Sequence, residues 1–291
     1  MKTFGRILIW LAILSALTLV AMGIWYFAFN GSQTTESLKW LQFLQTLGTF
    51  LLPPIICAWI WDSNHRPFAW LKMSNDRHSK TNIRLYLIAI LIMICAIPAI
   101  NLLADLNSHI KLPESLDFIE QFLKQQEETA AALTERFLQA DNIEQLLINI
   151  GLLALLPALA EELSFRGTLQ QILSNNHIAI WITAIIFSAI HMQFYGFIPR
   201  MLMGALFGYM FLWTGNLWIP ILMHFTNNGI AVIVYYLSDG IEENGKSCAD
   251  TIGAGTTWWL GLLSLLAVIG LIVFLLKSQD LPGYVRRTRK Q

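Results

Sequence analysis

Long apolar runs alternate with short polar segments along most of this 291-residue chain. A helix needs about 20 mostly apolar residues to cross the hydrocarbon core of a bilayer. The runs therefore predict an all-α, polytopic membrane helix bundle with about eight transmembrane helices. Their approximate ranges are 7–29, 40–61, 83–104, 145–173, 178–195, 201–213, 216/220–237 and 258–276.

The first run is interpreted as a retained span. It carries no charge between residues 7 and 29, which makes it long for the apolar part of a secretory signal, and no clear A-x-A cleavage site follows. Prolines interrupt three of the spans, at Pro53-Pro54, Pro98 and Pro157. We expect bends there, with neighbouring helices satisfying the backbone groups that each proline leaves unpaired.

Between residues 105 and 144 the chain becomes polar, but apolar side chains still recur at steps of three and four. This spacing predicts an amphipathic helix outside the membrane at about 113–144. Eight acidic and two basic residues fall within that segment. We interpret it as a solvated helix lying over the bundle; the alternative is a lid or a substrate-docking element. The apolar positions are Leu116, Ile119, Leu123, Ala130, Leu133 and Phe137.

Composition supports a membrane protein, because 55% of the residues are hydrophobic and only 13% are charged. The formal net charge of zero gives no indication of nucleic-acid binding. If the N-terminus is cytoplasmic, thirteen of the 19 lysines and arginines lie on the cytoplasmic side and six on the other. The positive-inside rule then places both termini in the cytoplasm. The expected location is the bacterial inner membrane.

The fourth span contains three charged residues, although a charge at bilayer depth is costly and rarely faces lipid. Glu162 and Arg166 are four residues apart and share a helix face, so Arg166 can neutralise Glu162. Glu161 points about 100° away around the helix axis. We therefore expect Glu161 to be the available acid. Ser164 lies on the same helix, but no base for it as a nucleophile can be identified.

Two later spans each carry a histidine. His191 follows Phe187 by four residues, and His224 precedes Asn228 by four. Counting from the expected cytoplasmic ends places Glu161, His191 and His224 at similar depths of about 10 to 20 Å. A single buried histidine is usually structural, but two histidines with an unpaired acid on three spans predict one polar pocket.

These residues, taken in order, resemble the motifs of the CPBP family, which comprises CAAX prenyl proteases and bacteriocin-processing, Abi-like membrane peptidases. The resemblance covers residues 145–240, whereas 1–144 and 241–291 carry no motif of the family. It implies a catalytic core at 145–240, preceded by a three-span region with the acidic helix and followed by a polar loop, the last span and a basic tail. The residues that carry the resemblance are Glu161, Glu162, Arg166, Phe187, His191, His224 and Asn228.

The resemblance implies an intramembrane endopeptidase, with Glu161 as general base and His191 as its partner. It further implies that His224 and Asn228 donate hydrogen bonds to the oxyanion, while Glu162 and Arg166 hold the site in shape. The residue types suit this chemistry by themselves. A carboxylate and a histidine can share a water that attacks a carbonyl, and amide or imidazole donors can stabilise the negative charge that develops.

Metal dependence is an open alternative. Glu161, His191 and His224 could hold Zn with a water in the fourth position. The chain has no H-E-x-x-H motif, and Asn228 is a poor zinc ligand but a good donor. We therefore expect no cofactor, with Zn as the alternative.

The expected partners are the lipid bilayer and a peptide or protein substrate in the membrane, while the sequence does not define the substrate or the oligomeric state. The main alternative function is a non-catalytic immunity or peptide-binding protein of the same fold. A proton-coupled transporter is a further one, although the sequence shows no convincing internal repeat.

Overall fold

All regular secondary structure is helical in the residues that the computed structural model describes, which are 3–73, 82–110, 112–238, 251–278 and 281. No strand occurs in these ranges, so the predicted all-α fold is confirmed. The expected polar loop at 239–250 and most of the basic tail lie outside the described residues. The elements, in order, are α1 (Thr3–Phe29), α2 (Thr35–Gln45), η1 (Thr46–Leu51), α3 (Leu52–Trp61), α4 (Pro67–Trp70), α5 (Ile83–Ser108), η2 (Glu114–Leu116), α6 (Asp117–Leu138), α7 (Ile143–Asn149), η3 (Ile150–Leu155), α8 (Leu156–Ser164), η4 (Phe165–Gln170), α9 (His177–Ala189), α10 (Phe197–Thr214), α11 (Trp218–Leu237), η5 (Gly255–Thr257) and α13 (Trp258–Lys277).

Seven helical stretches in the described ranges are long and apolar enough to cross a membrane. Six of them begin and end within a few residues of the predicted spans, and α10 starts earlier, at Phe197. The predicted span at 178–195 is wrong in length, because α9 has only 13 residues. At 1.5 Å per residue α9 is about 20 Å long, short of the roughly 30 Å hydrocarbon core. The seven are Thr3–Phe29, Thr35–Trp61, Ile83–Ser108, Ile143–Gln170, Phe197–Thr214, Trp218–Leu237 and Gly255–Lys277.

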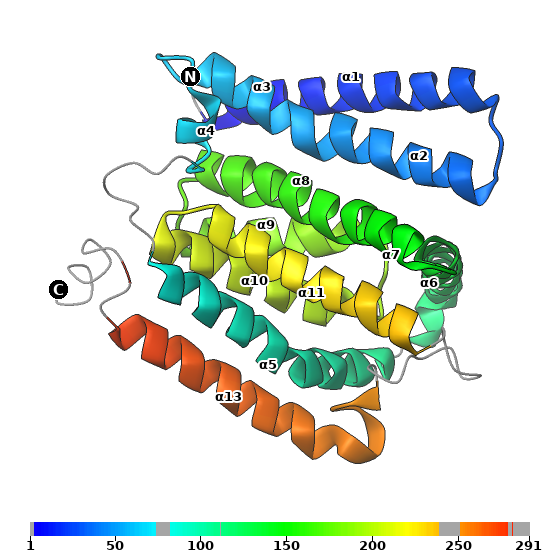
Figure 1. Cartoon of the computed structure of the whole chain (residues 1–291), viewed down its shortest axis with the longest axis vertical. Coiled ribbons are helices and arrows are strands. Elements are labelled where there is room, and N and C mark those ends of the chain that lie inside the picture. The colour runs from blue at the N-terminus through cyan, green and yellow to red at the C-terminus, as the bar shows by residue number, and fades with distance from the viewer. Residues whose placement is uncertain (1–2, 74–81, 111, 239–250, 279–280, 282–291) are drawn as a thin grey trace.

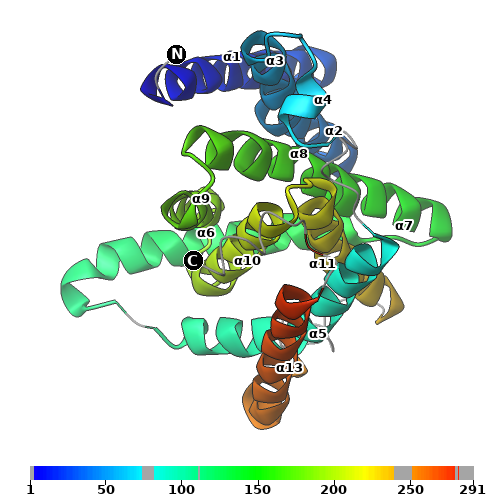
Figure 2. The ribbon, with the colours of Figure 1, turned by 90° about the vertical axis from the view of Figure 1, so that its left-hand side faces the viewer.

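The helices are arranged in successive rows across the bundle (Figure 1). The α1 and α2–α3 helices form one edge, α5 and α13 form the other, and α7–α8, α9, α10 and α11 lie between them. The first residues of α1 and the last of α13 lie at the same end, as the predicted topology requires. At the opposite end α6 lies across the bundle, roughly perpendicular to the spans (Figure 2).

Two of the spans change helix type just before a proline. In η1 and again in η3 the backbone forms a π-helix, and the next residue donates its N–H to the carbonyl five residues back: Leu52 to Leu47, and Leu156 to Gly151. Pro53 and Pro157 follow directly. A proline removes the donor for the carbonyl four residues earlier, so a wider turn ahead of it accommodates the lost bond. These π-helical turns lie at two of the three places where bends were predicted.

Near Pro98 a side chain of the neighbouring helix α13 bonds the α5 backbone. The hydroxyl of Ser264, on α13, accepts a 3.0 Å hydrogen bond from the Ala99 N–H and donates one to the Cys95 carbonyl. Both backbone groups belong to α5 and flank Pro98. One side chain therefore connects the α5 backbone to α13 beside Pro98.

The Ser264→Ala variant is expected to lower the free energy of unfolding by about 0.5–1.5 kcal/mol, because it removes the hydrogen bonds that connect α13 to the α5 backbone, while the Ala99 N–H and the Cys95 carbonyl, four residues apart, can still bond each other. Thermal or denaturant unfolding in detergent measures this change. Ser108→Ala is the matched control, since the exposed Ser108 hydroxyl bonds only its own helix among the described contacts, at Asp105. Equal changes in the two variants would contradict the bridging role.

Gly204 and Gly208 on α10 face the interior of the bundle. A Cβ on Gly204 would meet Ala184 at 3.3 Å, and one on Gly208 would meet Ile180 at 2.9 Å. Both neighbours belong to α9, so these glycines allow α9 and α10 to approach closely. The pair therefore serves packing within the bundle, and Gly204 lies directly beside the side chain of Arg166.

Candidate active site

Glu162 and Arg166 form a fully buried ion pair at the junction of α8 and η4. The Arg166 Nη1 donates to Glu162 Oε1 at 2.6 Å, and neither side chain is exposed. The four-residue spacing from which we predicted this pair is thus realised. Because breaking one partner would leave an uncompensated buried charge, the two residues depend on each other.

Three further contacts hold the Arg166 guanidinium in place. Its Nη2 donates to the Gly204 carbonyl at 2.9 Å. Its Cζ lies 4.8 Å from the ring centre of Phe187 and 5.4 Å from that of Phe207. Aromatic faces attract a cation more strongly when both are removed from water. Arg166 therefore connects α9 and α10 to the helix that carries the two acids.

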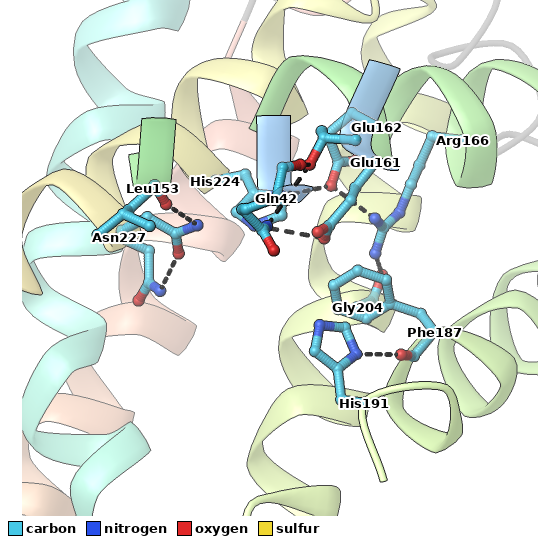
Figure 3. A network of polar contacts seen from close by, with 12 residues as sticks. Gln42, Leu153, Glu161, Glu162, Arg166, Phe187, His191, Gly204, His224 and Asn227 are labelled. Atoms are coloured by element: carbon cyan, nitrogen blue, oxygen red, sulfur yellow. Dashed lines mark hydrogen bonds and ion pairs between the residues drawn. The ribbon is translucent and has the colours of Figure 1, made fainter. Parts of the chain in front are cut away.

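His224 joins the same cluster through a bond to Glu162, a contact that the sequence did not predict. Its Nδ1 lies 2.9 Å from Glu162 Oε1, and its Nε2 lies 3.9 Å from Glu161 Oε2. The imidazole stacks on Phe207, with 5.5 Å between ring centres. His224 thus lies between the two carboxylates, bonded to Glu162 and next to Glu161 (Figure 3).

The bond to Glu162 restricts what the two nitrogens of His224 can do. An ionised carboxylate can only accept, so Nδ1 carries a proton and donates it. In neutral His224 the Nε2 atom is then an acceptor, and it becomes a donor only when the ring takes up a second proton. With that second proton, the positive charges of Arg166 and His224 balance the negative charges of Glu161 and Glu162. Neutrality is the condition under which buried charges are least costly.

Glu161 differs from Glu162 in its surroundings. Its side chain retains 16% exposure, whereas that of Glu162 has none. The 3.9 Å separation from His224 Nε2 is too long for a direct hydrogen bond but allows a small molecule beside both atoms to contact each. The Glu161 carboxylate therefore lies near His224 but, unlike the Glu162 carboxylate, makes no direct hydrogen bond with it.

His191 lies on the turn that follows α9, because that helix ends two residues before it. Its Nδ1 bonds the Phe187 carbonyl at 2.7 Å. This carbonyl is one of the last four of α9, which have no partner within the helix, so the ring acts as a side-chain cap. A carbonyl can only accept, which leaves Nε2 of a neutral His191 as an acceptor. The Phe187 ring contacts both His191 and His224, at 5.0 and 6.1 Å.

Asn228 faces a different partner from the one we expected. Its Nδ2 donates to the Leu153 carbonyl at 3.4 Å, and its Oδ1 accepts from Asn227 at 3.1 Å. Leu153 lies four residues before Pro157, which has no N–H to donate to its carbonyl. A side chain on α11 supplies a donor instead, as we expected for prolines within spans. The contact also links α11 to the wide turn ahead of the two acids.

The residues proposed as zinc ligands do not form a metal-binding group. Across the described ranges, no three His, Cys, Asp or Glu side chains gather in a way that could hold a metal ion. The bonds at Nδ1 of His224 and His191 leave both Nε2 atoms open, so it is the spacing of the side chains that does not suit a metal ion. These residues therefore do not fit a three-ligand zinc site as arranged, and no chemical step is derived through a metal.

Sequence reasoning missed two residues of this region. Phe207 contacts Arg166 and His224, but a phenylalanine inside an apolar run gives no signal of its own. Arg200 was counted among loop charges because the span was expected to start at residue 201. It lies instead in the first turn of α10, where a charge just ahead of an apolar run was the available signal.

Fold and site together define a polytopic α-helical membrane protein with a buried cluster of two glutamates, an arginine and a histidine. Residues 143–230 match the family described as type II CAAX prenyl endopeptidase Rce1-like. This segment therefore belongs to the CPBP family, as its motifs predicted.

A relative from Bacillus subtilis (strain 168), the uncharacterized protein YpbD, is 41% identical over 81 residues. The match covers 26% of this chain and 40% of that protein, so the chain spans less than half the length of this relative. No solved structure matches the chain.

Proposed function

We propose that this protein is an intramembrane endopeptidase, similar to CAAX proteases, which hydrolyses a peptide bond of a membrane-presented peptide or protein. The observation that carries the proposal is the position of Glu161, 3.9 Å from His224 Nε2, while Glu162 holds the other nitrogen of that ring. Membership of residues 143–230 in an endopeptidase family supports the same reaction class. Fold alone would not, because related folds host unrelated functions.

Glu161 acts as the general base in this proposal. It removes a proton from a water beside it while the water oxygen attacks the carbonyl carbon of the substrate. The resulting tetrahedral intermediate collapses with cleavage of the C–N bond, and Glu161 returns the proton to the leaving amine. One water is consumed, and the products are a carboxylic acid and an amine.

His224 stabilises the oxyanion in its doubly protonated form, donating from Nε2. Glu162 compensates the positive charge through the 2.9 Å bond to Nδ1, so the donor is fixed before the reaction begins. Pre-oriented donors of this kind contribute most in sites with little water. Asn228 would add a second donor if its amide left the Leu153 carbonyl, whose 3.4 Å bond is long and therefore weak.

His191 contributes a second contact to the attacking water. The cap on α9 fixes its ring, and the lone pair on Nε2 is available to accept a hydrogen bond. The ring then orients the water, while Glu161 takes the proton. Substrate reaches these groups from the bilayer, since Glu161 and His224 both lie within helices long enough to span it.

A single assay separates this function from the alternatives. Purified protein and its Glu161→Ala variant are incubated in liposomes with a library of membrane peptides, with and without a divalent-metal chelator. We expect cleavage by the wild type, loss of cleavage in the variant and no effect of the chelator. Peptide binding without cleavage would favour an immunity or peptide-binding protein, and proton-dependent uptake would favour transport. Cleavage that the chelator abolishes and added Zn²⁺ restores would overturn the metal-independent mechanism.

A further inference from the structure

Arg200 is a positively charged residue close to the candidate active site to which the proposed reaction gives no role. It lies in the first turn of α10, on the side of the bundle where α9 ends. Its Nη2 donates to Gln193 Oε1 at 2.6 Å. Its Nη1 is buried and makes no hydrogen bond within the part of the chain that the structure describes. A buried donor without an acceptor is costly, so it indicates a site for a missing acceptor.

Two carboxylates lie near enough to Arg200 for their charges to interact with it. One is Glu161, the proposed base, and the other is Glu127 on α6. Arg200 also interacts with His191. The charge of Arg200 is therefore felt both by the proposed base and by an acid of the amphipathic helix α6.

Glu127 belongs to the helix that we predicted either as a solvated helix or as a lid. Its Oε2 accepts a 3.3 Å hydrogen bond from the Tyr195 N–H, in the loop between α9 and α10. Burial raises the pKa of Glu127, whereas the Tyr195 N–H and the charge of Arg200 act in the opposite direction. The carboxylate on α6 is thus held at the loop that carries His191, although being charged there is costly.

The chemistry of the Arg200 guanidinium indicates that its ligand is a carboxylate. A guanidinium presents its N–H groups in a planar fork that matches the two oxygens of a carboxylate. The N-terminal turn of α10 adds the positive end of a helix dipole at the same place. Gly196 lets the guanidinium lie close to the loop backbone, because a Cβ there would be only 3.0 Å from Nη2.

We propose that Arg200 is a specificity-determining residue that binds a carboxylate of the substrate, for which Glu127 is the resident competitor when no substrate is bound. The inference rests on the proposed peptidase function. The carboxylate is either the C-terminal group of the substrate or an acidic side chain near the cleaved bond. Both have the same chemistry, and the experiment distinguishes them.

The test uses three otherwise identical membrane peptides: one with a free C-terminal acid, one with a C-terminal amide, and the amide with an internal aspartate. Steady-state cleavage is measured for wild type, Arg200→Gln, and Arg136→Gln as a control. We expect the wild type to show a KM about 10- to 100-fold lower for one acidic peptide than for the neutral amide, the range for a hydrogen bond to a charged group. Arg200→Gln should lose that ratio, and Arg136→Gln should keep it.

The ratio between peptides is the decisive readout, because a general loss of turnover in Arg200→Gln would affect all three equally. A ratio that persists in Arg200→Gln, or a wild type that cleaves all three alike, would overturn the role of Arg200 and leave the peptidase function standing. Failure of the wild type to cleave any of them would count against the peptidase function itself.

If Arg200→Gln does not fold, Glu127→Gln carries the test. Removing the resident carboxylate should lower the KM for the preferred acidic peptide several-fold and leave the KM for the neutral amide unchanged. The control is Glu128→Gln, the adjacent acid on α6, for which we expect no change. Equal KM values for the preferred peptide in Glu127→Gln and the wild type would refute the competition.

Discussion

The Glu161→Gln variant is expected to cleave peptides about 10²- to 10⁴-fold more slowly than the wild type, with little change in stability. Glutamine has nearly the same shape as glutamate but cannot take a proton from water. The fully buried Glu162–Arg166 ion pair keeps both of its members in this variant. Single-turnover cleavage rates in liposomes, measured beside unfolding in the same lipid, check both halves of this expectation.

Two matched variants show whether the loss of cleavage in Glu161→Gln is specific to the proposed base. Glu144→Gln alters an exposed acid at the start of the same span and should leave the rate unchanged. Glu162→Gln should also slow cleavage, but through His224, whose Nδ1 loses its carboxylate partner. It should therefore lower stability as well. Turnover of Glu161→Gln within a few-fold of the wild type would rule out this residue as the base.

The Arg166→Met variant is expected to lower the free energy of unfolding by about 3–5 kcal/mol, the largest effect on stability that we predict. It leaves the fully buried Glu162 carboxylate without its 2.6 Å partner. It also removes the donor to the Gly204 carbonyl and the cation between Phe187 and Phe207. Equilibrium unfolding in detergent, followed by circular dichroism, measures this loss.

The double variant Glu162→Leu with Arg166→Met is the informative control, because it removes both charges together. Apolar replacement of a whole buried ion pair is often neutral or stabilising. We therefore expect the double variant to recover most of the stability lost in Arg166→Met, while cleavage remains impaired because His224 has lost its partner. A double variant as unstable as the single one would mean that packing of the arginine, not charge pairing, dominates.

The sequence predicted the helices well because a membrane span has a simple requirement: enough consecutive apolar residues to cross the hydrocarbon. It failed at α9, where apolar residues continue past Ala189 but the helix does not. Apolarity indicates what can lie in lipid, whereas a helix end depends on a local alternative for the backbone. Here the His191 ring provides that alternative at the Phe187 carbonyl.

For the site, helical spacing predicted the Glu162–Arg166 pair, because residues four apart on one helix are neighbours. Contacts between helices were harder to predict. Nothing in the spacing of His224 and Asn228 indicates that His224 bonds Glu162, or that Asn228 turns to Leu153. Those outcomes depend on rotamers and on how α11 is rotated against α8. Arg200 was assigned to a loop because the predicted span started one residue after it.

The Ser264 hydroxyl that bridges Ala99 and Cys95 bears on where the chain can be truncated. The segment matched to the family ends at residue 230, yet Ser264 lies beyond it, on the final helix. A truncated protein that stops after α11 would lose this bridge and the packing of Val268 and Leu275 against α5. We therefore expect the region that carries the family signature to be less stable alone than within the whole chain.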